Sequence, residues 1–261
     1  MRIKFQKYQG TGNDFIIINN ESLNFPQKNY ELISRLCDRK FGIGSDGLIL
    51  INPSETTDYE MVYFNSDNGL AGSMCGNGGR CSVLFALNNG IAKKKISFKA
   101  HDGDHFASFD NGLVSLSIKD VTKIKYFGKD LFIDTGSPHY IKIINNNLEN
   151  YDVYNNGIKI NNTLEFKNER VNVNFVEKIS NSEFFVRTYE RGVNNETLSC
   201  GTGVTAVALA MFALEKTSLN ELNIKTRGGN LNVSFNSNEI GFNSIYLSGK
   251  VKLVYEGEIE L

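Results

Sequence analysis

LSCGTGVTAVALAMFAL, residues 198–214, and MCGNGGRCSVLFALN, residues 74–88, have the same construction. In each, a Cys-Gly-x-Gly segment runs directly into an apolar stretch of helical length, which predicts a buried helix with a cysteine at its N-terminus. Unpaired backbone N–H groups at that end of a helix favour the thiolate form of a cysteine. The two segments indicate a duplicated unit with one reactive sulfur, Cys75 or Cys200, in each half.

Strand patterns fill most of the remaining chain. Short runs rich in β-branched and aromatic residues recur between Gly, Asn and Asp, which is typical of antiparallel sheet. One more helix is expected over residues 30–39, where apolar residues have helical spacing. The expected strands cover residues 2–8, 15–19, 48–51, 60–64, 96–100, 105–109, 113–118, 131–134, 140–144, 170–176, 184–189, 223–226, 231–235 and 245–255.

These patterns predict an α+β fold made of two pseudo-symmetric halves. Each half is expected to be a mostly antiparallel, barrel-like sheet around one buried helix, with the active site in the cleft between the halves. Residues 1–119, joined by a C-terminal strand at 250–261, are expected to carry Cys75. Residues 120–249 are expected to carry Cys200.

The overall composition limits the classes of function. A net charge of −1 leaves no basic surface typical of proteins that bind nucleic acid or anionic membranes. The first residues alternate like a strand and lack the apolar segment of a secretory signal. Four cysteines in a chain of 261 residues do not make a disulfide framework. We therefore expect a cytoplasmic protein with reduced thiols and with neither nucleic-acid nor membrane partners.

Two thiols are suited to inverting a carbon stereocentre by proton transfer. A thiolate removes hydrogen from one face while a thiol delivers hydrogen to the opposite face, and their roles exchange in the reverse direction. The glycines let the backbone come close to a ligand, and the N–H groups of a helix start can bind its carboxylate. The same groups would stabilise negative charge during deprotonation.

Other roles for the thiols are less well supported by the sequence. A metal site is not expected, because Cys75 and Cys81 are six positions apart, no CxxC segment exists and histidines are few. A disulfide between Cys75 and Cys200 would inactivate the protein in a reducing compartment. Burial of both thiols as structural residues is the simplest alternative. Cys37 and Cys81 lie within helical apolar patterns and are expected to be buried.

Several segments of the chain match, in order, the motifs of a known family: residues 10–15, 41–47, 74–81, 136–139, 171–175, 189–192 and 199–203. In these segments the chain resembles the diaminopimelate epimerase family. The resemblance implies the two-half fold and the interconversion of LL- and meso-2,6-diaminopimelate without pyridoxal phosphate, metal or any other cofactor. It also implies a small amino-acid substrate, a place in lysine and peptidoglycan precursor synthesis, and a homodimer.

Individual roles are also implied by this resemblance. Cys75 and Cys200 match the two acid–base thiols, and His139 and Glu190 match residues that tune the pKa values of these thiols. On local sequence alone, the asparagines are more typical of turns or strand ends, and His139 is more typical of a structural histidine. The residues that the resemblance assigns to substrate binding are Asn13, Asn65, Gly76, Asn77, Asn172, Glu190, Arg191, Gly201 and Thr202.

The chain departs from the family pattern at a few positions. Gly47 occupies a position where many members of the family have Gln, so this loop lacks the side-chain contact that a Gln would make. Ser137 replaces an Asn and reaches less far toward a substrate. The loops before the two cysteines are one residue longer than in many relatives. These changes concern substrate affinity and specificity rather than the type of reaction.

Two other functions compete with diaminopimelate epimerisation. The first is a related amino-acid racemase or isomerase of the proline or hydroxyproline type, which would need a small closed pocket. Diaminopimelate instead carries a second amino-carboxylate group, which Asn65, Asn172 and Arg191 are suited to bind. The second is a non-catalytic amino-acid-binding or thiol-redox protein.

Overall fold

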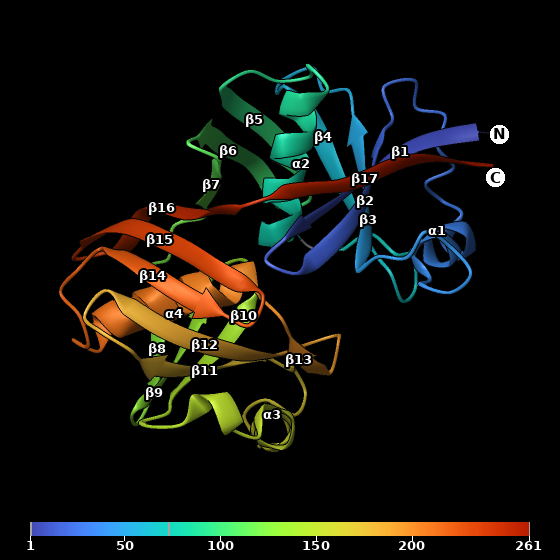
Figure 1. The fold of residues 1–261 in the computed structure, drawn as a ribbon. Helices are drawn as coiled ribbons and strands as arrows, with labels where there is room; N and C mark the ends of the chain where they lie inside the picture. Colours follow the sequence, from blue (N-terminus) through green and yellow to red (C-terminus); the bar gives the residue numbers. More distant parts are fainter. Residues whose placement is uncertain (1, 73, 261) are drawn as a thin grey trace. The chain divides into compact units, whose positions relative to one another are not determined.

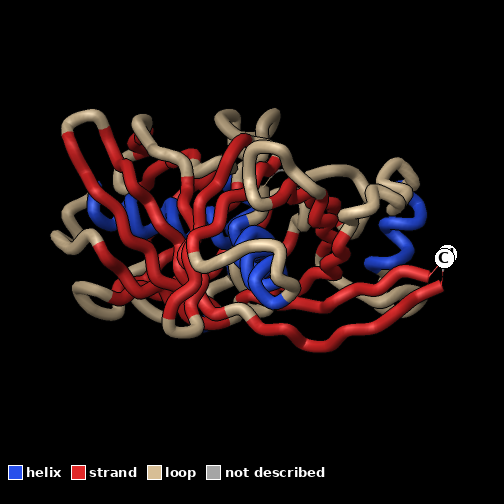
Figure 2. The backbone as a smooth tube through the Cα atoms, turned by 90° about the horizontal axis from the view of Figure 1, so that it is seen from above, coloured by secondary structure: helices blue, strands red, loops and turns tan. Residues whose placement is uncertain are grey.

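The computed structural model describes residues 2–72 and 74–260. Contacts within the chain divide it into two units: unit 1 comprises residues 1–116 with 249–261, and unit 2 comprises residues 117–248. Most of the chain is strand or loop, and the helices are few and short (Figure 2). None of the helices in the described ranges has both the length and the apolar character needed to cross a bilayer.

Unit 1 begins and ends in one pair of strands. The first and last strands of the chain pair antiparallel, with Arg2 opposite Glu260 (Figure 1). The elements of this unit are β1 (Arg2–Gly10), β2 (Asn13–Asn19), α1 (Tyr30–Cys37), β3 (Gly47–Asn52), β4 (Tyr59–Asn65), α2 (Gly76–Asn88), β5 (Lys95–Ala100), β6 (Gly103–Asp110), β7 (Leu113–Ile118, which crosses the unit boundary) and β17 (Lys252–Glu260).

Unit 2 has a similar order of elements, with a few short elements added. They are β8 (Ile124–Phe127), β9 (Asp130–Asp134), β10 (Pro138–Ile143), a short 3-10 turn (Leu148–Asn150), α3 (Val153–Asn161), β11 (Asn172–Lys178), β12 (Glu183–Glu190), β13 (Asn195–Thr197), α4 (Gly201–Ala213), β14 (Glu221–Thr226), β15 (Gly229–Asn238) and β16 (Gly241–Lys250, which also crosses the unit boundary).

Strand pairing follows the same alternation in both units. From β1 to β6, neighbouring pairs are antiparallel, parallel, antiparallel, parallel and antiparallel. The same sequence of pairings links β9, β10, β11, β12, β14 and β15. In each parallel pair, a helix connects the first strand to the second, because parallel strands need a long crossover connection. The predicted α+β class with two related halves is confirmed.

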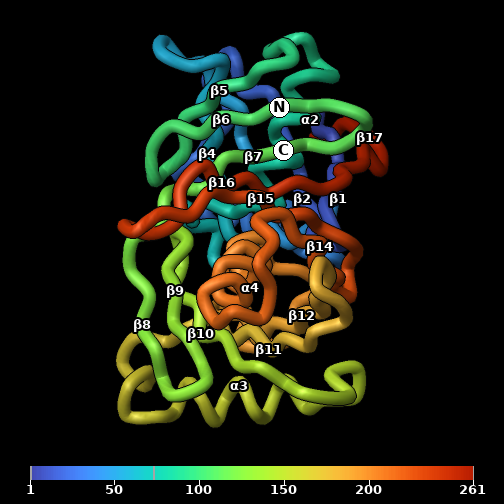
Figure 3. The backbone as a smooth tube through the Cα atoms, turned by 90° about the vertical axis from the view of Figure 1, so that its left-hand side faces the viewer, coloured from blue at the N-terminus to red at the C-terminus, as the bar shows by residue number. Residues whose placement is uncertain are grey.

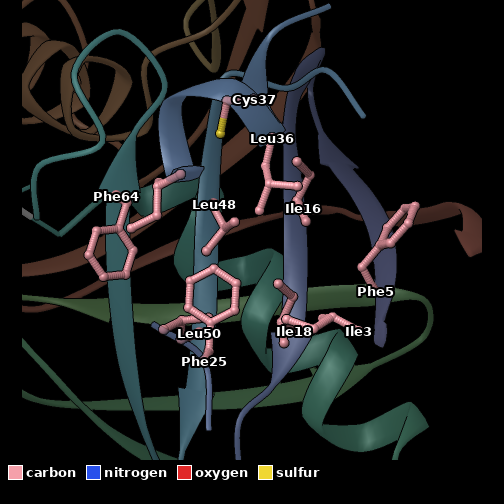
Figure 4. Packing of buried hydrophobic residues seen from close by; sticks show 11 residues of the cluster. Ile3, Phe5, Ile16, Ile18, Phe25, Leu36, Cys37, Leu48, Leu50 and Phe64 are labelled. Carbon is pink, nitrogen blue, oxygen red and sulfur yellow. The ribbon is translucent and has the colours of Figure 1, made fainter. Parts of the chain in front are cut away.

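Strands β2 and β3 are buried on both faces, which explains their unbroken apolar sequences. On one face, Ile16 and Leu48 pack with α1 and the rest of a core cluster (Figure 4). On the other face lie Phe15 and Ile49, next to α2: a methyl group at Gly78 would lie 3.2 Å from Ile49 Cδ1 and 3.5 Å from Phe15 Cε1.

Each unit is built around its second helix. Helix α4 contacts β9, β10, β11, β12, β14 and β15, and these strands surround it (Figure 3). Nearly every residue of α4 is buried, as its uniformly apolar sequence predicts. The predicted helices at α1, α2 and α4 are confirmed, with ends that differ from the prediction by at most three residues.

Helix α3 is not predicted by apolar periodicity, because its centre, Asn155-Asn156-Gly157, is typical of a turn. Asp152 caps the helix by accepting a hydrogen bond from the Asn155 N–H at 3.1 Å. Gly157 lies directly against Tyr189, where a Cβ atom would be 2.3 Å from the ring. Tertiary packing therefore outweighs the local turn preference. Helix α1 has the equivalent position in unit 1. A comparison of the sequences of the two halves would therefore have predicted α3.

The prediction of one strand over residues 245–255 is wrong. Strand β16 ends at Lys250 and β17 begins at Lys252, since β17 pairs with β1 in unit 1. Strands β8 and β13 are also absent from the prediction. They have four and three residues, too few to establish an alternating pattern.

Candidate active site

Cys75 is the N-cap residue of α2, and its side chain is half-buried. Its sulfur accepts a hydrogen bond from the Gly78 N–H at 3.5 Å. The thiol donates to Oδ1 of Asn13 at 3.7 Å. The sulfur therefore lies where the first N–H groups of the helix favour negative charge.

Arg80, in the first turns of α2, is completely buried. Its guanidinium donates to Asn77 Oδ1 at 2.9 Å and to the Gly76 carbonyl at 3.3 Å. Burial lowers the pKa of Arg80 to about 10, although the nearby Cys81 and Cys75 act to raise it. Arg80 is therefore charged at neutral pH, and its charge favours a thiolate at Cys75.

Asn13 is held by a cluster of charged residues. Its Nδ2 donates to Asp46 at 2.8 Å. Arg39 donates to Asp14 at 2.6 Å and to Asp46 at 2.8 Å, while the buried Lys7 lies 2.8 Å from Asp14. Because Asp46 accepts from the amide nitrogen, the Asn13 oxygen is directed toward Cys75.

This cluster predicts a pH-dependent stability. Burial acts to raise the pKa of Asp14, but hydrogen bonds from Arg39 and Lys7 outweigh it and lower the pKa to about 2. The stabilisation is present above the unfolded pKa near ~3.9 and is lost as the pH falls toward 2. Urea unfolding between pH 6 and pH 2 should show a loss of roughly 2 kcal/mol that Asp14→Asn lacks. Asp120→Asn, at an exposed aspartate, is the control; equal pH profiles for wild type and Asp14→Asn would contradict the prediction.

Cys200 is the N-cap residue of α4 and is 7% exposed. Its sulfur lies 3.6 Å from the Thr202 hydroxyl. The carbonyl of Thr202 accepts a hydrogen bond from the Thr135 hydroxyl at 2.9 Å, which ties the first turn of α4 to the end of β9. The two cysteines thus occupy equivalent places in the two units, as predicted.

His139, on β10, is completely buried, and its Nε2 lies 2.9 Å from the Thr202 hydroxyl. Burial and the positive charge of Arg191 lower the pKa of His139 to about 3. The imidazole is therefore neutral at physiological pH. His139 reaches Cys200 through Thr202.

Asn172 lies at the start of β11, and its side-chain amide makes hydrogen bonds within unit 2. It donates to the Ser137 hydroxyl at 2.9 Å and accepts from the Arg191 N–H at 2.8 Å. Asn172 therefore fixes the backbone at Arg191, whose side chain is exposed.

The side chains of Glu190 and Asn65 also make hydrogen bonds within their own units. Glu190 accepts a hydrogen bond from the Thr197 hydroxyl at 2.8 Å. In unit 1, the Asn65 amide donates to the Leu70 carbonyl at 3.4 Å.

All four cysteines are thiols in the structure. Cys37 and Cys81 are buried, as predicted, and burial raises the pKa of both, that of Cys37 to about 11. Across residues 2–72 and 74–260, no group of three or more His, Cys, Asp or Glu side chains is arranged to hold a metal ion.

Comparison with known sequences identifies the family. A sequence model of the family described as "Diaminopimelate epimerase" matches residues 5–126 and 131–254. The chain belongs to the diaminopimelate epimerase family. Proteins named diaminopimelate epimerase from Flavobacterium psychrophilum and Chlorobaculum tepidum are 48% and 40% identical to this chain. The first alignment covers 98% of this chain and 100% of the relative, and the second covers 97% and 99%.

Solved structures of more distant proteins share the fold. A phenazine biosynthesis protein of the PhzF family from Bacillus anthracis has a TM-score of 0.79 at 14% identity, covering 100% of both chains. A hydroxyproline epimerase from Agrobacterium vitis has a TM-score of 0.71 at 12% identity, covering 100% of this chain and 93% of its own. At such identities the likeness concerns the fold alone.

The structure gives a physical reason for Gly47, one of the departures from the family pattern. A Cβ atom at this position would lie 2.4 Å from Cε2 of Tyr63 and 2.8 Å from the Phe64 carbonyl. The Tyr63 ring, which also makes an edge contact with Phe15, thus occupies the space that a side chain at 47 would need. A second departure, Ser137, accepts a hydrogen bond from the Asn172 amide at 2.9 Å.

The sequence prediction missed three residues around the two cysteines: Arg80, Asp46 and Asn174. Asn174 is completely buried on β11, and its amide lies 3.0 Å from Nδ1 of His139. A polar residue at an inward position of an otherwise apolar strand was the available signal. Only the register of β10 and β11, which pairs His139 with Asn172, brings Asn174 close to His139.

Proposed function

We propose that the protein interconverts LL- and meso-2,6-diaminopimelate, with Cys75 and Cys200 as its two acid–base groups and no cofactor. The observation that carries the proposal is the equivalent position of the two thiols. Each is the N-cap residue of the central helix of its unit. Membership of the diaminopimelate epimerase family supports the choice of substrate.

In the proposed reaction, one cysteine acts as thiolate and the other as thiol. The thiolate removes the α-hydrogen as a proton from one face of the carbon. The electron pair left behind takes a proton from the thiol on the opposite face, so that the stereocentre inverts. The two sulfurs have then exchanged protonation states, and exchange with solvent restores the starting state. The reverse reaction uses the same groups in opposite roles.

The first N–H groups of α2 and α4 have no carbonyl partner within their own helices, which makes them suitable for a substrate carboxylate. We assign this role to Gly76, Asn77, Gly201 and Thr202. Negative charge that develops on the carboxylate during deprotonation is stabilised by the same groups. Arg191 is suited to the second carboxylate, because a guanidinium can bind it with two hydrogen bonds.

Further polar contacts with the substrate are assigned to four other residues. Asn13 lies beside Cys75, and Asn172 holds the backbone of Arg191. The full set for this role is Asn13, Asn65, Asn172 and Glu190.

Hydrogen exchange tests the proposal directly. The protein is incubated in D₂O with LL-diaminopimelate, proline and hydroxyproline in separate reactions, and deuterium at the α-carbon is measured by mass spectrometry. We expect deuterium in diaminopimelate alone, with both isomers present at the end. Deuterium in proline or hydroxyproline instead would favour the related racemase. Binding of diaminopimelate with no exchange would favour a non-catalytic protein.

We also infer a cytoplasmic protein that forms a homodimer, as the family resemblance implies. A reducing compartment suits the inference, because both thiols must stay reduced to act as acid and base. Sedimentation equilibrium of the purified protein tests the dimer, and a mass equal to one chain at micromolar concentration would contradict it.

A further inference from the structure

A continuous row of hydrogen bonds leads to the sulfur of Cys200. Its members are Thr188, Asn174, His139, Thr202 and Cys200, which we call the Cys200 network. Successive contacts measure 2.9 Å, 3.0 Å, 2.9 Å and 3.6 Å along this row. Thr188, Asn174 and His139 are at most 3% exposed, so water does not replace their mutual contacts.

The amide of Asn174 is oriented by its other contacts. Its Nδ2 lies 3.4 Å from the carbonyl oxygen of Tyr140, which can only accept a hydrogen bond. Its Oδ1 accepts from the Thr188 hydroxyl at 2.9 Å. The opposite orientation would place two oxygens together at Tyr140. The amide nitrogen of Asn174 must therefore be the atom that faces His139.

This orientation determines the protonation of the imidazole. An amide nitrogen only donates, so Nδ1 of His139 must accept and cannot carry a proton. Because the imidazole is buried and neutral, its single proton is on Nε2. Nε2–H then donates to the Thr202 hydroxyl, which leaves the hydroxyl proton of Thr202 available to the Cys200 sulfur.

We propose that Asn174 is a positioning residue that holds His139 as the Nε2–H tautomer, so that every hydrogen bond of the Cys200 network is donated toward the Cys200 sulfur. This inference rests on the proposed function, in which that sulfur is a thiolate for half of the catalytic cycle. The network stabilises the thiolate without moving a proton of its own. Both nitrogens of His139 are occupied, so this histidine serves as a hydrogen-bond donor and does not act as a base.

Nuclear magnetic resonance can observe the tautomer directly in the unmodified protein. The chain has only three histidines, so the ring nitrogens of histidine-labelled protein are resolved by long-range ¹H–¹⁵N correlation. Single variants His101→Gln and His105→Gln assign the other two rings. We expect His139 as the Nε2–H form at neutral pH. An Nδ1–H form or an imidazolium at neutral pH would overturn the proposal.

Asn174→Asp replaces a hydrogen-bond donor by an acceptor. A carboxylate accepts only, so a hydrogen bond between it and His139 requires a proton on Nδ1 of His139. The variant therefore no longer favours the Nε2–H tautomer. We expect the His139 signals to change to an Nδ1–H or doubly protonated form. We also expect kcat to fall at least about tenfold, with little change in KM. For comparison, a positioned group that itself transfers the proton raises the rate by a factor of ~10²–10⁴. Retention of the Nε2–H form in this variant would contradict the proposal.

Thr188→Val is a milder variant that keeps the shape of the side chain and removes only the hydroxyl bound to Asn174. We expect a smaller drop in kcat in the same direction. Its matched control is Thr226→Val, because Thr226 is also a buried strand threonine of unit 2, and its hydroxyl donates to the Gly229 carbonyl at 2.8 Å. Equal losses of kcat in the two variants would show a merely structural effect and overturn the proposal.

The two proposals fail separately. The tautomer of His139 is measured without substrate, whereas the proposed function is measured by deuterium exchange. A protein with the expected tautomer and no exchange would contradict diaminopimelate epimerisation alone. A protein that exchanges deuterium but carries the other tautomer would contradict the role of Asn174 alone.

Discussion

The Cys75→Ala and Cys200→Ala variants are each expected to lose the conversion of LL- to meso-diaminopimelate by roughly 10³-fold. Inversion needs one group to take a proton and another to give one, and a variant with a single thiol lacks half of this pair. The rate is followed by chromatographic separation of the two isomers. A variant that keeps more than about a tenth of the wild-type rate would contradict the two-thiol mechanism.

The single-thiol variants also separate the roles of the two sulfurs. The remaining cysteine can still remove and return a proton on its own face, so each variant is expected to exchange deuterium into one isomer only. Cys75→Ala and Cys200→Ala should select opposite isomers. Exchange into the same isomer by both variants would show that the thiols do not serve opposite faces.

Cys37→Ala is the matched control for these variants. Cys37 is a thiol at the C-terminal end of α1, where it is buried in the core cluster of unit 1. Its pKa is raised by burial, so it is protonated at neutral pH. We expect a modest loss of stability from the lost packing and an unchanged rate of epimerisation. Circular dichroism of all three variants establishes that the fold is retained.

Gly203→Ala is expected to have the second-largest effect, because Gly203 lies against the Cys200 network. A Cβ atom at this position would be 2.4 Å from Oδ1 of Asn174 and 3.3 Å from Cε1 of His139. The methyl group must displace Asn174, which is completely buried. Overpacking of this kind costs about 1–3 kcal/mol, offset in part by the better helix propensity of alanine, about 1 kcal/mol.

Displacement of Asn174 should also weaken the hydrogen bond that holds His139. We therefore expect Gly203→Ala to lower kcat about tenfold or more, since it disturbs a group that we propose acts on the Cys200 thiolate. Urea unfolding measures the stability, and steady-state kinetics measure kcat and KM separately. An unchanged kcat would contradict the contribution of the Cys200 network.

Gly78→Ala provides the control from the other half of the repeat. Gly78 has the equivalent place in the Cys-Gly-x-Gly segment of α2. A Cβ atom there would be 3.2 Å from Cδ1 of Ile49, a terminal methyl that can rotate away, and 3.5 Å from Cβ of Cys75. We expect a change in the free energy of unfolding within about 1 kcal/mol. A larger loss in Gly78→Ala than in Gly203→Ala would show that the clash with Asn174 is not the cause.

Helices and strands that depend mainly on neighbouring residues were predictable from the sequence. Helices α2 and α4 follow from apolar residues within a few positions of one another, and the glycines directly after Cys75 and Cys200 mark where those helices begin. The repeated Cys-Gly-x-Gly segment indicated two related halves. The continuous apolar runs of β2 and β3 were recognisable as strands, although their burial on both faces was not.

Local signals failed where packing decides the conformation. Residues 155–157 are typical of a turn, but the contact of Gly157 with Tyr189 holds them in α3. The break at Val251 depends on the pairing of β17 with β1, at the opposite end of the sequence. Neither contact leaves a pattern within the segment that it affects.

The amino-acid sequence by itself determined where the two thiols lie, at the N-termini of two buried helices, because helix starts depend on neighbouring residues. Only the tertiary structure decided which groups surround each sulfur. Arg80, Asp46 and Asn174 gained their roles through burial and through strand register, which join residues distant in the chain. The direction of a hydrogen bond depends on all of its partners at once, so the protonation of His139 becomes readable only when Asn174, Thr188 and Thr202 lie together.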